Sequence, residues 1–339
     1  MTVPGQAEAA LLEVRGLRTV FPTDAGEFAA VDGVDFDIRA GRTLAIVGES
    51  GCGKSVTSLS IMGLLPVPAR NAGGSIRFDG QELLGLDEDH LRKLRGSRLA
   101  MIFQEPMTSL NPAFTIGAQI VEALLCHYPV SRAEARTRAI EALRRVRMPS
   151  PESRFDEYPH RLSGGMRQRA MIAMALVCRP RLLIADEPTT ALDVTIQAQI
   201  LGLMDELQRD TGTAIMLITH DLGVVAELAD EVLVMYAGRI VERAPAVRLF
   251  AEPQHPYTIG LLGSMPRLEG RAGRLPTIEG QVPGANRRLT GCRFADRCPF
   301  TEQACRDGEP ALVAVGGNSD HWSACLKAPL DPERLQVRR

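Results

Sequence analysis

The sequence predicts an α/β protein in which helices cover a largely parallel β-sheet. Continuous apolar runs at 42–47, 182–185 and 214–218 have the composition of strands that are buried on both faces. The first run lies between glycines, and helical patterns alternate with such runs through the first two-thirds of the chain. This alternation is typical of a parallel sheet with helices on its faces.

Size and composition fit a globular protein, since 339 residues suffice for two domains or one large one. The formal net charge of −2 argues against nucleic acid as the main partner. No apolar run reaches the roughly 18 residues of a membrane span, and the first residues lack the pattern of a signal peptide. We therefore expect a cytosolic protein whose seven cysteines are thiols or metal ligands rather than disulfides.

The stretch GESGCGKS at 48–55 follows the first apolar run and matches the P-loop pattern, and a helical pattern at 54–65 comes next. In such a loop, glycines let backbone N–H groups surround phosphate oxygens. Lys54 would neutralise the phosphates of ATP, and the Ser55 hydroxyl would bind Mg²⁺. Because Cys52 lies inside the loop, we expect thiol reagents to block ATP binding. The nucleotide-binding residues expected here are Gly48, Glu49, Ser50, Gly51, Cys52, Gly53, Lys54 and Ser55.

Polar side chains follow other apolar runs of the predicted sheet. Asp186 ends one run and is placed to hold Mg²⁺ through water, whereas Glu187 is placed to polarise the attacking water as a general base. Gln104 follows the run at 99–103 and could reach Mg²⁺ and the attacking water, and His220 could contact the γ-phosphate. Taken alone, acids after a core strand or a single histidine are more often structural.

Residues 105–165 show a mostly helical pattern between two halves of the predicted sheet. SRAE in this segment has the form of a capping box, with Ser131 as the N-cap and Glu134 reaching back to it. After about residue 245, proline and glycine punctuate the chain and regular periodicity fades.

The stretch LSGGMRQR at 162–169 predicts a second anion-binding site. Ser163, Gly164 and Gly165 would stand at the beginning of a helix, where free N–H groups and the helix dipole favour a negative charge. By itself this pattern would also fit an ordinary N-cap with a glycine turn.

Together these residues resemble the nucleotide-binding subunits of ABC transporters. The resemblance covers residues 11–245. It implies a P-loop NTPase cassette with a RecA-like parallel sheet core, an antiparallel β part, a helical subdomain insert and a small irregular C-terminal metal-binding extension. The implied parts are the core at 1–104 and 166–245, the helical subdomain at 105–165 and the extension at 246–339. The motifs, each present once and in the family's order, are the P-loop, Gln104, LSGGMRQR, LLIADE at 182–187, ALD at 191–193 and His220.

The resemblance also implies roles and a partner. In the family the adenine stacks on an aromatic residue upstream of the P-loop. Phe21 is the candidate here and Phe28 the rival, although either could be a core residue. The signature of one domain completes the P-loop site of another, so the chain implies a second, non-identical ATPase subunit. Because Lys54, Glu187 and His220 are all present, we expect hydrolysis at the site built on this P-loop.

Three further stretches are similar to the oligopeptide and dipeptide importer branch. They are FQEPMTSLNP at 103–112, IADEPTTALDVTIQAQI at 184–200 and HPYT at 255–258. The branch implies two membrane permeases, an extracytoplasmic peptide-binding protein and a peripheral position on the cytoplasmic face of the membrane. In the family the helical insert receives a permease helix, and Gln104 links that contact to the γ-phosphate.

Four cysteines gather in the C-terminal extension, namely Cys292, Cys298, Cys305 and Cys325. In a reducing compartment such a group indicates a metal rather than disulfides, and both Zn²⁺ and a 4Fe–4S cluster use four thiolates. The spacing that is usual for zinc is absent, and His321 could replace one cysteine. Three arginines would offset the negative charge for either metal, namely Arg293, Arg297 and Arg306.

The residues themselves leave iron–sulfur and zinc equally open. The resemblance favours the 4Fe–4S cluster, because similar importer ATPases carry one on this four-cysteine pattern. A structural role is expected, since a metal can staple a segment whose own core is small.

Other functions remain open from the sequence. One is a soluble ABC ATPase that acts on ribosomes or DNA, although two cassettes or long coiled-coil inserts are not visible here. Another is an importer of a different substrate, such as nickel or glutathione, because selectivity lies in the permeases and the binding protein. A redox sensor with a vestigial ATPase is disfavoured by the intact motifs.

Overall fold

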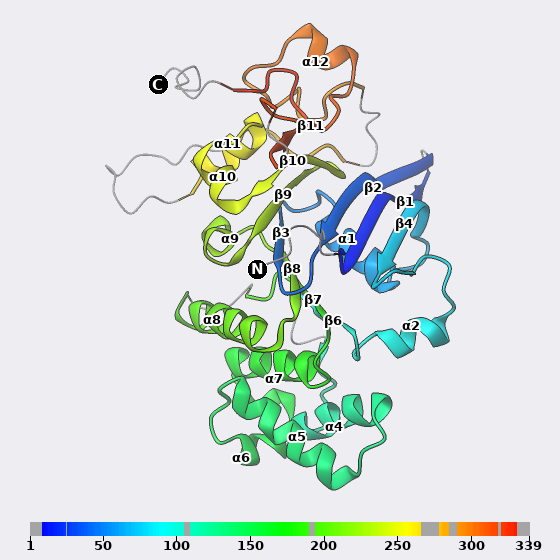
Figure 1. Ribbon diagram of the computed structural model, residues 1–339, viewed down its shortest axis with the longest axis vertical. Coiled ribbons are helices and arrows are strands. Elements are labelled where there is room, and N and C mark those ends of the chain that lie inside the picture. Colours follow the sequence, from blue (N-terminus) through cyan, green and yellow to red (C-terminus); the bar gives the residue numbers. More distant parts are fainter. Residues whose placement is uncertain are drawn as a thin grey trace, which may run out of the picture. The chain divides into compact units, whose positions relative to one another are not determined.

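The computed structural model describes residues 9–24, 26–104, 109–189, 194–265, 278–284, 290–317 and 320–330. These residues form two compact units (Figure 1). The first unit takes the described residues within 1–12, 37–43 and 77–218, and the second takes those within 13–36, 44–76 and 219–339. Among the described helices, none has both the length and the apolar character needed to span a bilayer.

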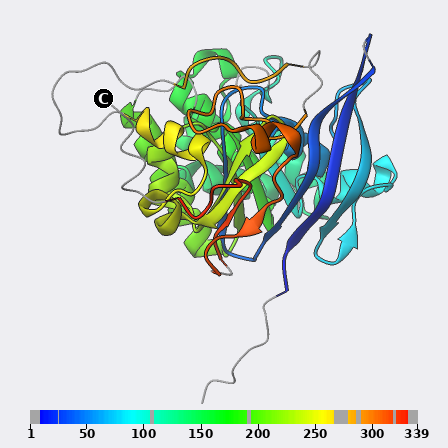
Figure 2. The same cartoon turned by 90° about the horizontal axis from the view of Figure 1, so that it is seen from above.

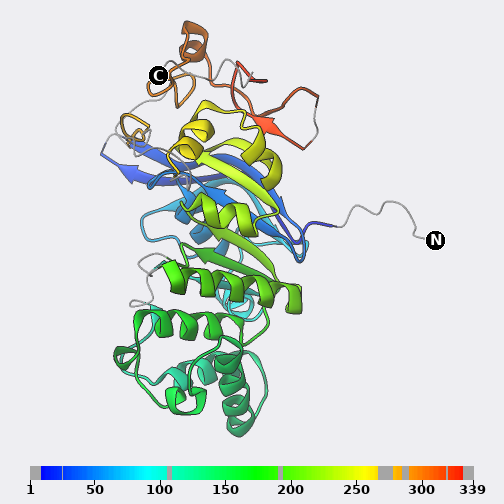
Figure 3. The same cartoon turned by 90° about the vertical axis from the view of Figure 1, so that its left-hand side faces the viewer.

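The first unit combines parallel strands with a group of helices. Helices α4 and α5 both pack against α7, and α6 packs against α4 and α5 (Figure 3). The elements of this unit are β5 (Gln81–Glu82), α2 (Glu88–Leu94), β6 (Leu99–Ile102), α4 (Ile116–His127), α5 (Arg132–Arg145), α6 (Pro151–Phe155), the 3₁₀ helix η1 (Pro159–Arg161), α7 (Gly164–Leu176), β7 (Leu182–Asp186), α8 (Val194–Thr211) and β8 (Ala214–Ile218).

The strands of this unit confirm two of the apolar runs. Strand β7 pairs in parallel with β6 on one side and with β8 on the other, with Ile184 opposite Met101 and Met216. Every residue of the three strands is buried. Burial on both faces explains why these strands read as continuous apolar runs rather than as alternating patterns.

Local sequence determines where the helices begin and how closely they approach. The predicted N-cap of α5 is confirmed, since the Ser131 hydroxyl accepts a hydrogen bond from the Glu134 backbone N–H at 3.2 Å. The Glu134 carboxylate accepts a bond from Arg138 at 2.5 Å. In α4, a side chain at Gly117 would bring its Cβ within 2.3 Å of the Phe155 ring, so only glycine permits this contact between α4 and α6.

The second unit contains the remaining strands and the C-terminal elements. Its strand β1 lies between β2 and β4 (Figure 2). The elements that fall wholly or mostly in this unit are β1 (Leu12–Thr23), β2 (Gly26–Ile38), β3 (Thr43–Val47), α1 (Lys54–Met62), β4 (Arg70–Phe78), α9 (Leu222–Leu228), β9 (Glu231–Tyr236), β10 (Arg239–Pro245), α10 (Ala246–Ala251), α11 (Pro256–Gly263), α12 (Gln303–Asp307), β11 (Val313–Ala314) and β12 (Trp322–Ser323).

The second unit has its own parallel and antiparallel strand pairs. Strand β3, which confirms the apolar run at 42–47, pairs in parallel with β9, and Ile46 lies opposite Leu233. From β9 the order continues antiparallel through β10 and β12 to β11. The last two strands come from the end of the chain, so the C-terminal segment (the described residues from 246 to 330) extends this sheet.

The C-terminal segment also shares the hydrophobic core of the second unit. Tyr257 and Phe294 are buried in one cluster with Val47, Val234 and Tyr236. The Tyr236 ring centroid lies 4.7 Å from that of Tyr257 and 5.2 Å from that of Phe294, both in edge-on geometry. Aromatic pairs of this kind add to the free energy gained from burial. This part of the segment is therefore held by ordinary core packing.

A fully buried carboxylate on β10 fastens the C-terminal segment further. One oxygen of Glu242 accepts hydrogen bonds from the Gln254 backbone N–H at 2.6 Å and from His321 Nε2 at 2.8 Å. The other accepts a bond from the His255 backbone N–H at 2.9 Å. Glu242 is 0% exposed, and a carboxylate is tolerated there because donors surround it.

The buried N-cap of α11 should make the protein sensitive to acid. His255 is 2% exposed, and its Nδ1 accepts a hydrogen bond from the Tyr257 backbone N–H at 3.1 Å. Burial lowers the pKa of His255 to about 3. The unfolded chain, with a His pKa of about 6.5, therefore takes up a proton before the native state does as the pH falls. The stability due to the neutral ring is complete above about pH 6.5, and we expect about 2 kcal/mol of it to be lost at pH 5.

The variant His255→Asn tests this expectation. Asparagine keeps an N-cap acceptor but does not titrate, so denaturant unfolding between pH 8 and pH 5 should show a shallower loss of stability than in the wild type. Equal slopes in the two proteins would contradict the assignment.

Candidate functional site

The predicted P-loop connects β3 to α1 in the second unit. Lys54, the first residue of α1, is 5% exposed, and its Nζ donates to the Gly48 carbonyl at 2.8 Å and the Glu49 carbonyl at 3.1 Å. Gly48 has φ +152, and a Cβ there would lie 2.2 Å from the Met235 carbonyl oxygen. Gly53 has φ +107, and its Cβ would lie 2.3 Å from the Ala30 carbonyl oxygen. Glycine is thus required where the loop runs against neighbouring backbone.

The Cys52 side chain is less accessible than the sequence suggested. It is 1% exposed, and burial raises the pKa of its thiol. Because alkylation needs an accessible thiolate, the expectation that thiol reagents block ATP binding through Cys52 is weakened. We instead expect the exposed Cys126 to react first.

The loop that carries His220 is attached to the same strand that leads into the P-loop. The Thr219 backbone N–H donates to the Ile46 carbonyl on β3 at 3.3 Å. His220 is exposed, and Asp221 caps the following helix α9 by accepting bonds from two of its backbone N–H groups. The structure therefore brings the predicted histidine loop and the P-loop strand together within the second unit.

In the first unit the predicted acids and the predicted glutamine lie together. Asp186 is the last residue of β7 and is 4% exposed. Glu187 follows with φ +47, a region that non-glycine residues rarely adopt and that is enriched at functional sites. Its backbone N–H donates to the Ile218 carbonyl at 2.8 Å, and its carboxylate accepts a hydrogen bond from Gln104 Nε2 at 3.0 Å. A direct contact between these two side chains was not expected from the sequence.

The signature stretch begins helix α7 as predicted. Ser163 is the N-cap, and its hydroxyl accepts a hydrogen bond from the Met166 backbone N–H at 3.3 Å. Gly164 and Gly165 form the first turn, and a Cβ at Gly165 would lie 2.9 Å from the Ile196 side chain. The small residues thus let α8 approach the beginning of α7.

The adenine contact and the role of the ALD stretch both stay predictions. Phe21 on β1 and Phe28 on β2 are both half-buried and lie on neighbouring strands, so the adenine contact stays a prediction. The ALD stretch at 191–193 lies outside the described residues.

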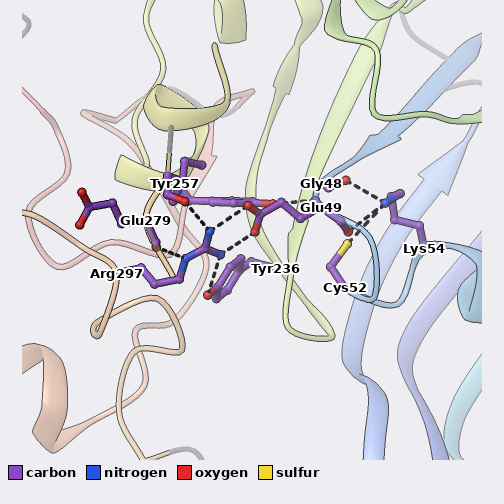
Figure 4. A network of polar contacts seen from close by, with 9 residues as sticks. Gly48, Glu49, Cys52, Lys54, Tyr236, Tyr257, Glu279 and Arg297 are labelled. Atoms are coloured by element: carbon purple, nitrogen blue, oxygen red, sulfur yellow. Dashed lines mark hydrogen bonds and ion pairs between the residues drawn. The ribbon is translucent and has the colours of Figure 1, made fainter. Parts of the chain in front are cut away.

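Sequence reasoning missed the partners of one P-loop residue. Glu49 is bonded by Arg297 and Tyr257, which both belong to the C-terminal segment (Figure 4). The HPYT stretch contains Tyr257, but nothing in the sequence pattern connects it to the P-loop.

The four clustered cysteines line one small cavity. Burial raises the pKa of the Cys292 and Cys325 thiols, and it raises that of Cys298 to about 11. The Cys292 backbone N–H donates to the Cys305 carbonyl at 2.7 Å, which fixes two of the cysteine loops to each other. Within the described ranges, however, no three His, Cys, Asp or Glu side chains are arranged to hold a metal ion, so neither the zinc site nor the 4Fe–4S cluster is seen.

Two expectations about the surroundings of this cavity were wrong. His321 is bonded to Glu242 and is not among the residues that line the cavity, so it does not replace a cysteine. Each of the three arginines is paired with carboxylates and so does not serve as spare positive charge for a metal. Their partners are Asp32 and Glu309 for Arg293, Glu49 for Arg297, and Asp296 for Arg306.

The sequence is similar to known families over most of its length. Residues 31–190 match the ABC transporter family, and residues 241–305 match the C-terminal region of oligopeptide and dipeptide transporters. The chain is 56% identical to a probable peptide ABC transporter ATP-binding protein of Sinorhizobium fredii, over 94% of this chain and 95% of that protein. It is 52% identical to the oligopeptide transport ATP-binding protein OppD of Salmonella typhimurium, over 94% of this chain and 93% of that protein.

Solved structures show a related fold. An ATP-binding cassette in a dimeric, post-hydrolysis state with ADP and phosphate has a TM-score of 0.63 and 26% identity, over 69% of this chain and 98% of that chain. The structure of cbiO1 from Clostridium perfringens, part of an ABC transporter complex, has a TM-score of 0.62 and 31% identity, over 72% of this chain and 92% of that chain.

Proposed function

Because the chain belongs to the ATP-binding proteins of peptide-importing ABC transporters, we propose that it hydrolyses ATP to drive peptide uptake across a membrane. The observation that carries the proposal is the 52–56% identity to peptide-transport ATP-binding proteins over 94% of the chain. This similarity includes both the cassette motifs and the C-terminal region. A relative that shared only the cassette would leave the substrate class open.

Each predicted site residue has a separate role in ATP hydrolysis. The P-loop backbone and Lys54 bind the phosphates of ATP, and Lys54 must exchange its bonds to loop carbonyls for bonds to phosphate. Mg²⁺, when bound, neutralises developing charge, and Ser55, Asp186 and Gln104 are the residues that would hold it. Glu187 takes the proton of the attacking water as general base. Its hydrogen bond from Gln104 supports this role, because the amide orients the carboxylate.

The chain requires a partner to complete its site. It has one P-loop and one signature stretch, and we propose that Ser163, Gly164 and Gly165 contact the nucleotide on a second, non-identical ATPase subunit. His220 acts at the γ-phosphate and Phe21 at the adenine. Two permeases and an extracytoplasmic peptide-binding protein complete the importer, with this chain at the cytoplasmic face of the membrane.

We also propose that the four cysteines hold a 4Fe–4S cluster. Their common cavity and the burial of the Cys292, Cys298 and Cys325 thiols support this, because a cationic group would favour the thiolates that burial disfavours. Zinc would use the same four thiolates, and the resemblance to importer ATPases, not the geometry of the cavity, favours the cluster. Its role is structural.

Anaerobic purification from native membranes, followed by mass spectrometry and absorption spectroscopy, tests both proposals. We expect two permeases, a second ATPase and a peptide-binding protein to copurify, and a brown preparation with iron and sulfide. Recovery from the soluble fraction with ribosomes or nucleic acid would refute the importer. A colourless protein with stoichiometric zinc would refute the cluster alone.

A further inference from the structure

The P-loop residue Glu49 is held at two points by the C-terminal segment (Figure 4). Arg297 donates two hydrogen bonds to its carboxylate, at 2.5 Å and 2.8 Å, in a bidentate pair. The Tyr257 hydroxyl accepts a hydrogen bond from the Glu49 backbone N–H at 2.7 Å. This N–H is therefore engaged by the C-terminal segment in the structure. We call the three residues Glu49, Tyr257 and Arg297 the P-loop anchor.

Arg297 is a rigid partner because its own surroundings fix it. Its side chain is 6% exposed, and it donates to the Glu279 carbonyl at 2.8 Å and to the Ile278 carbonyl at 3.2 Å. The hydrogen bond to Glu49 raises the pKa of Arg297, so the guanidinium stays charged. A buried, planar guanidinium with several acceptors loses little freedom when it binds a carboxylate.

The anchor bears directly on the phosphate-binding lysine. The carbonyl of Glu49 is one of the two that accept hydrogen bonds from Lys54 Nζ. The backbone of this residue is thus fixed on one side by Tyr257 and contacts Lys54 on the other. A shift of Glu49 would move an acceptor that positions Lys54 before ATP arrives.

The charge of Glu49 also needs an explanation. A carboxylate within a loop that binds the phosphates of ATP would repel them if it were unpaired, and it is only 30% exposed to the screening solvent. Arg297 offsets this charge through its bidentate pair with the carboxylate.

From this geometry we propose that Arg297 is a positioning residue for ATP binding. It neutralises Glu49 and, with Tyr257, holds the P-loop in the conformation that receives the phosphates. The C-terminal segment is then part of the nucleotide-binding apparatus of this chain as well as an attachment to the cassette.

Steady-state kinetics of the purified, assembled complex test the proposal. Arg297→Met should raise KM for ATP roughly tenfold while kcat changes less than about twofold, because the interaction affects nucleotide binding rather than the chemical step. Adding Glu49→Gln to Arg297→Met removes the unpaired charge and should return KM to within about threefold of the wild-type value.

Arg293→Met is the matched control. Arg293 is also largely buried in the C-terminal segment, but it binds Asp32, Glu309 and the Ala237 carbonyl instead. Its KM for ATP should stay within twofold of the wild-type value. Should Arg297→Met fail to assemble, Tyr257→Phe offers a second variant with the same direction of change in KM.

Two results would overturn the proposal. One is an unchanged KM with a lower kcat or a smaller active fraction, which is what a merely structural arginine would give. The other is a double variant no better than Arg297→Met, since the charge of Glu49 would then have no effect on ATP binding.

Discussion

Replacing Glu187 with glutamine is expected to stop ATP hydrolysis while ATP binding persists. Glutamine has the shape of glutamate, so the turn after β7 and the contact with Gln104 can be kept, but an amide cannot take a proton from water. General bases contribute about 10²–10⁴-fold to rate, so phosphate release by the assembled complex should fall at least a hundredfold. If the partner subunit's site hydrolyses ATP independently, the rate should instead fall by the fraction of total hydrolysis that this chain's site contributes.

Radiolabelled ATP retained on the complex separates binding from hydrolysis in this experiment. The Glu187→Gln complex should retain intact ATP, whereas the wild type should release ADP. Glu206→Gln is the control, because it makes the same change at an exposed carboxylate paired with Arg147, where an ion pair contributes little. Unchanged hydrolysis in Glu187→Gln would remove the general base from this position.

Glu242→Gln is expected to cause the largest loss of stability. The two oxygens of Glu242 accept three hydrogen bonds, from Gln254, His255 and His321. An amide in their place would point its N–H₂ group at one or more of these donors, in a site with 0% exposure. Leaving buried donors unpaired should cost about 2–4 kcal/mol, which corresponds to a fall in Tm of roughly 5–10 °C.

Thermal unfolding followed by circular dichroism measures this loss, and hydrogen exchange at residues 254–258 locates it. Glu252→Gln makes the same change on an exposed side chain of the same segment and should shift Tm by less than about 2 °C. A comparable shift in both variants would mean that the buried carboxylate does not hold the C-terminal segment.

Local patterns were enough to predict the elements that carry the motifs. Strand β8 has the predicted bounds, because a run of five apolar residues between polar turns has few other solutions. Ser131 caps α5 and Ser163 caps α7 because an N-cap depends on residues within one helical turn. The P-loop could be predicted equally well, since its motif lies in one short stretch and its glycines are required where the loop runs against neighbouring backbone.

Interactions between distant residues could not be predicted in the same way. Arg297 and Glu49 are 248 positions apart, and Glu242 and His321 are 79 apart, so no periodicity or spacing relates them. Arg297 and His321 lie close to the clustered cysteines along the chain, which is why the sequence alone predicts both as part of the cysteine site. In the structure both side chains are buried, and each is paired with a carboxylate that the fold brings to it, Glu49 for Arg297 and Glu242 for His321.

Peptide uptake into proteoliposomes by the purified complex decides whether this ATPase drives peptide import. With peptide-loaded binding protein outside and ATP inside, labelled peptide should accumulate in the vesicles, and ATP hydrolysis should rise with it. The Glu187→Gln complex should do neither. An ATP hydrolysis rate that does not change with the peptide-loaded binding protein, together with no uptake of peptide, would refute a role in peptide import.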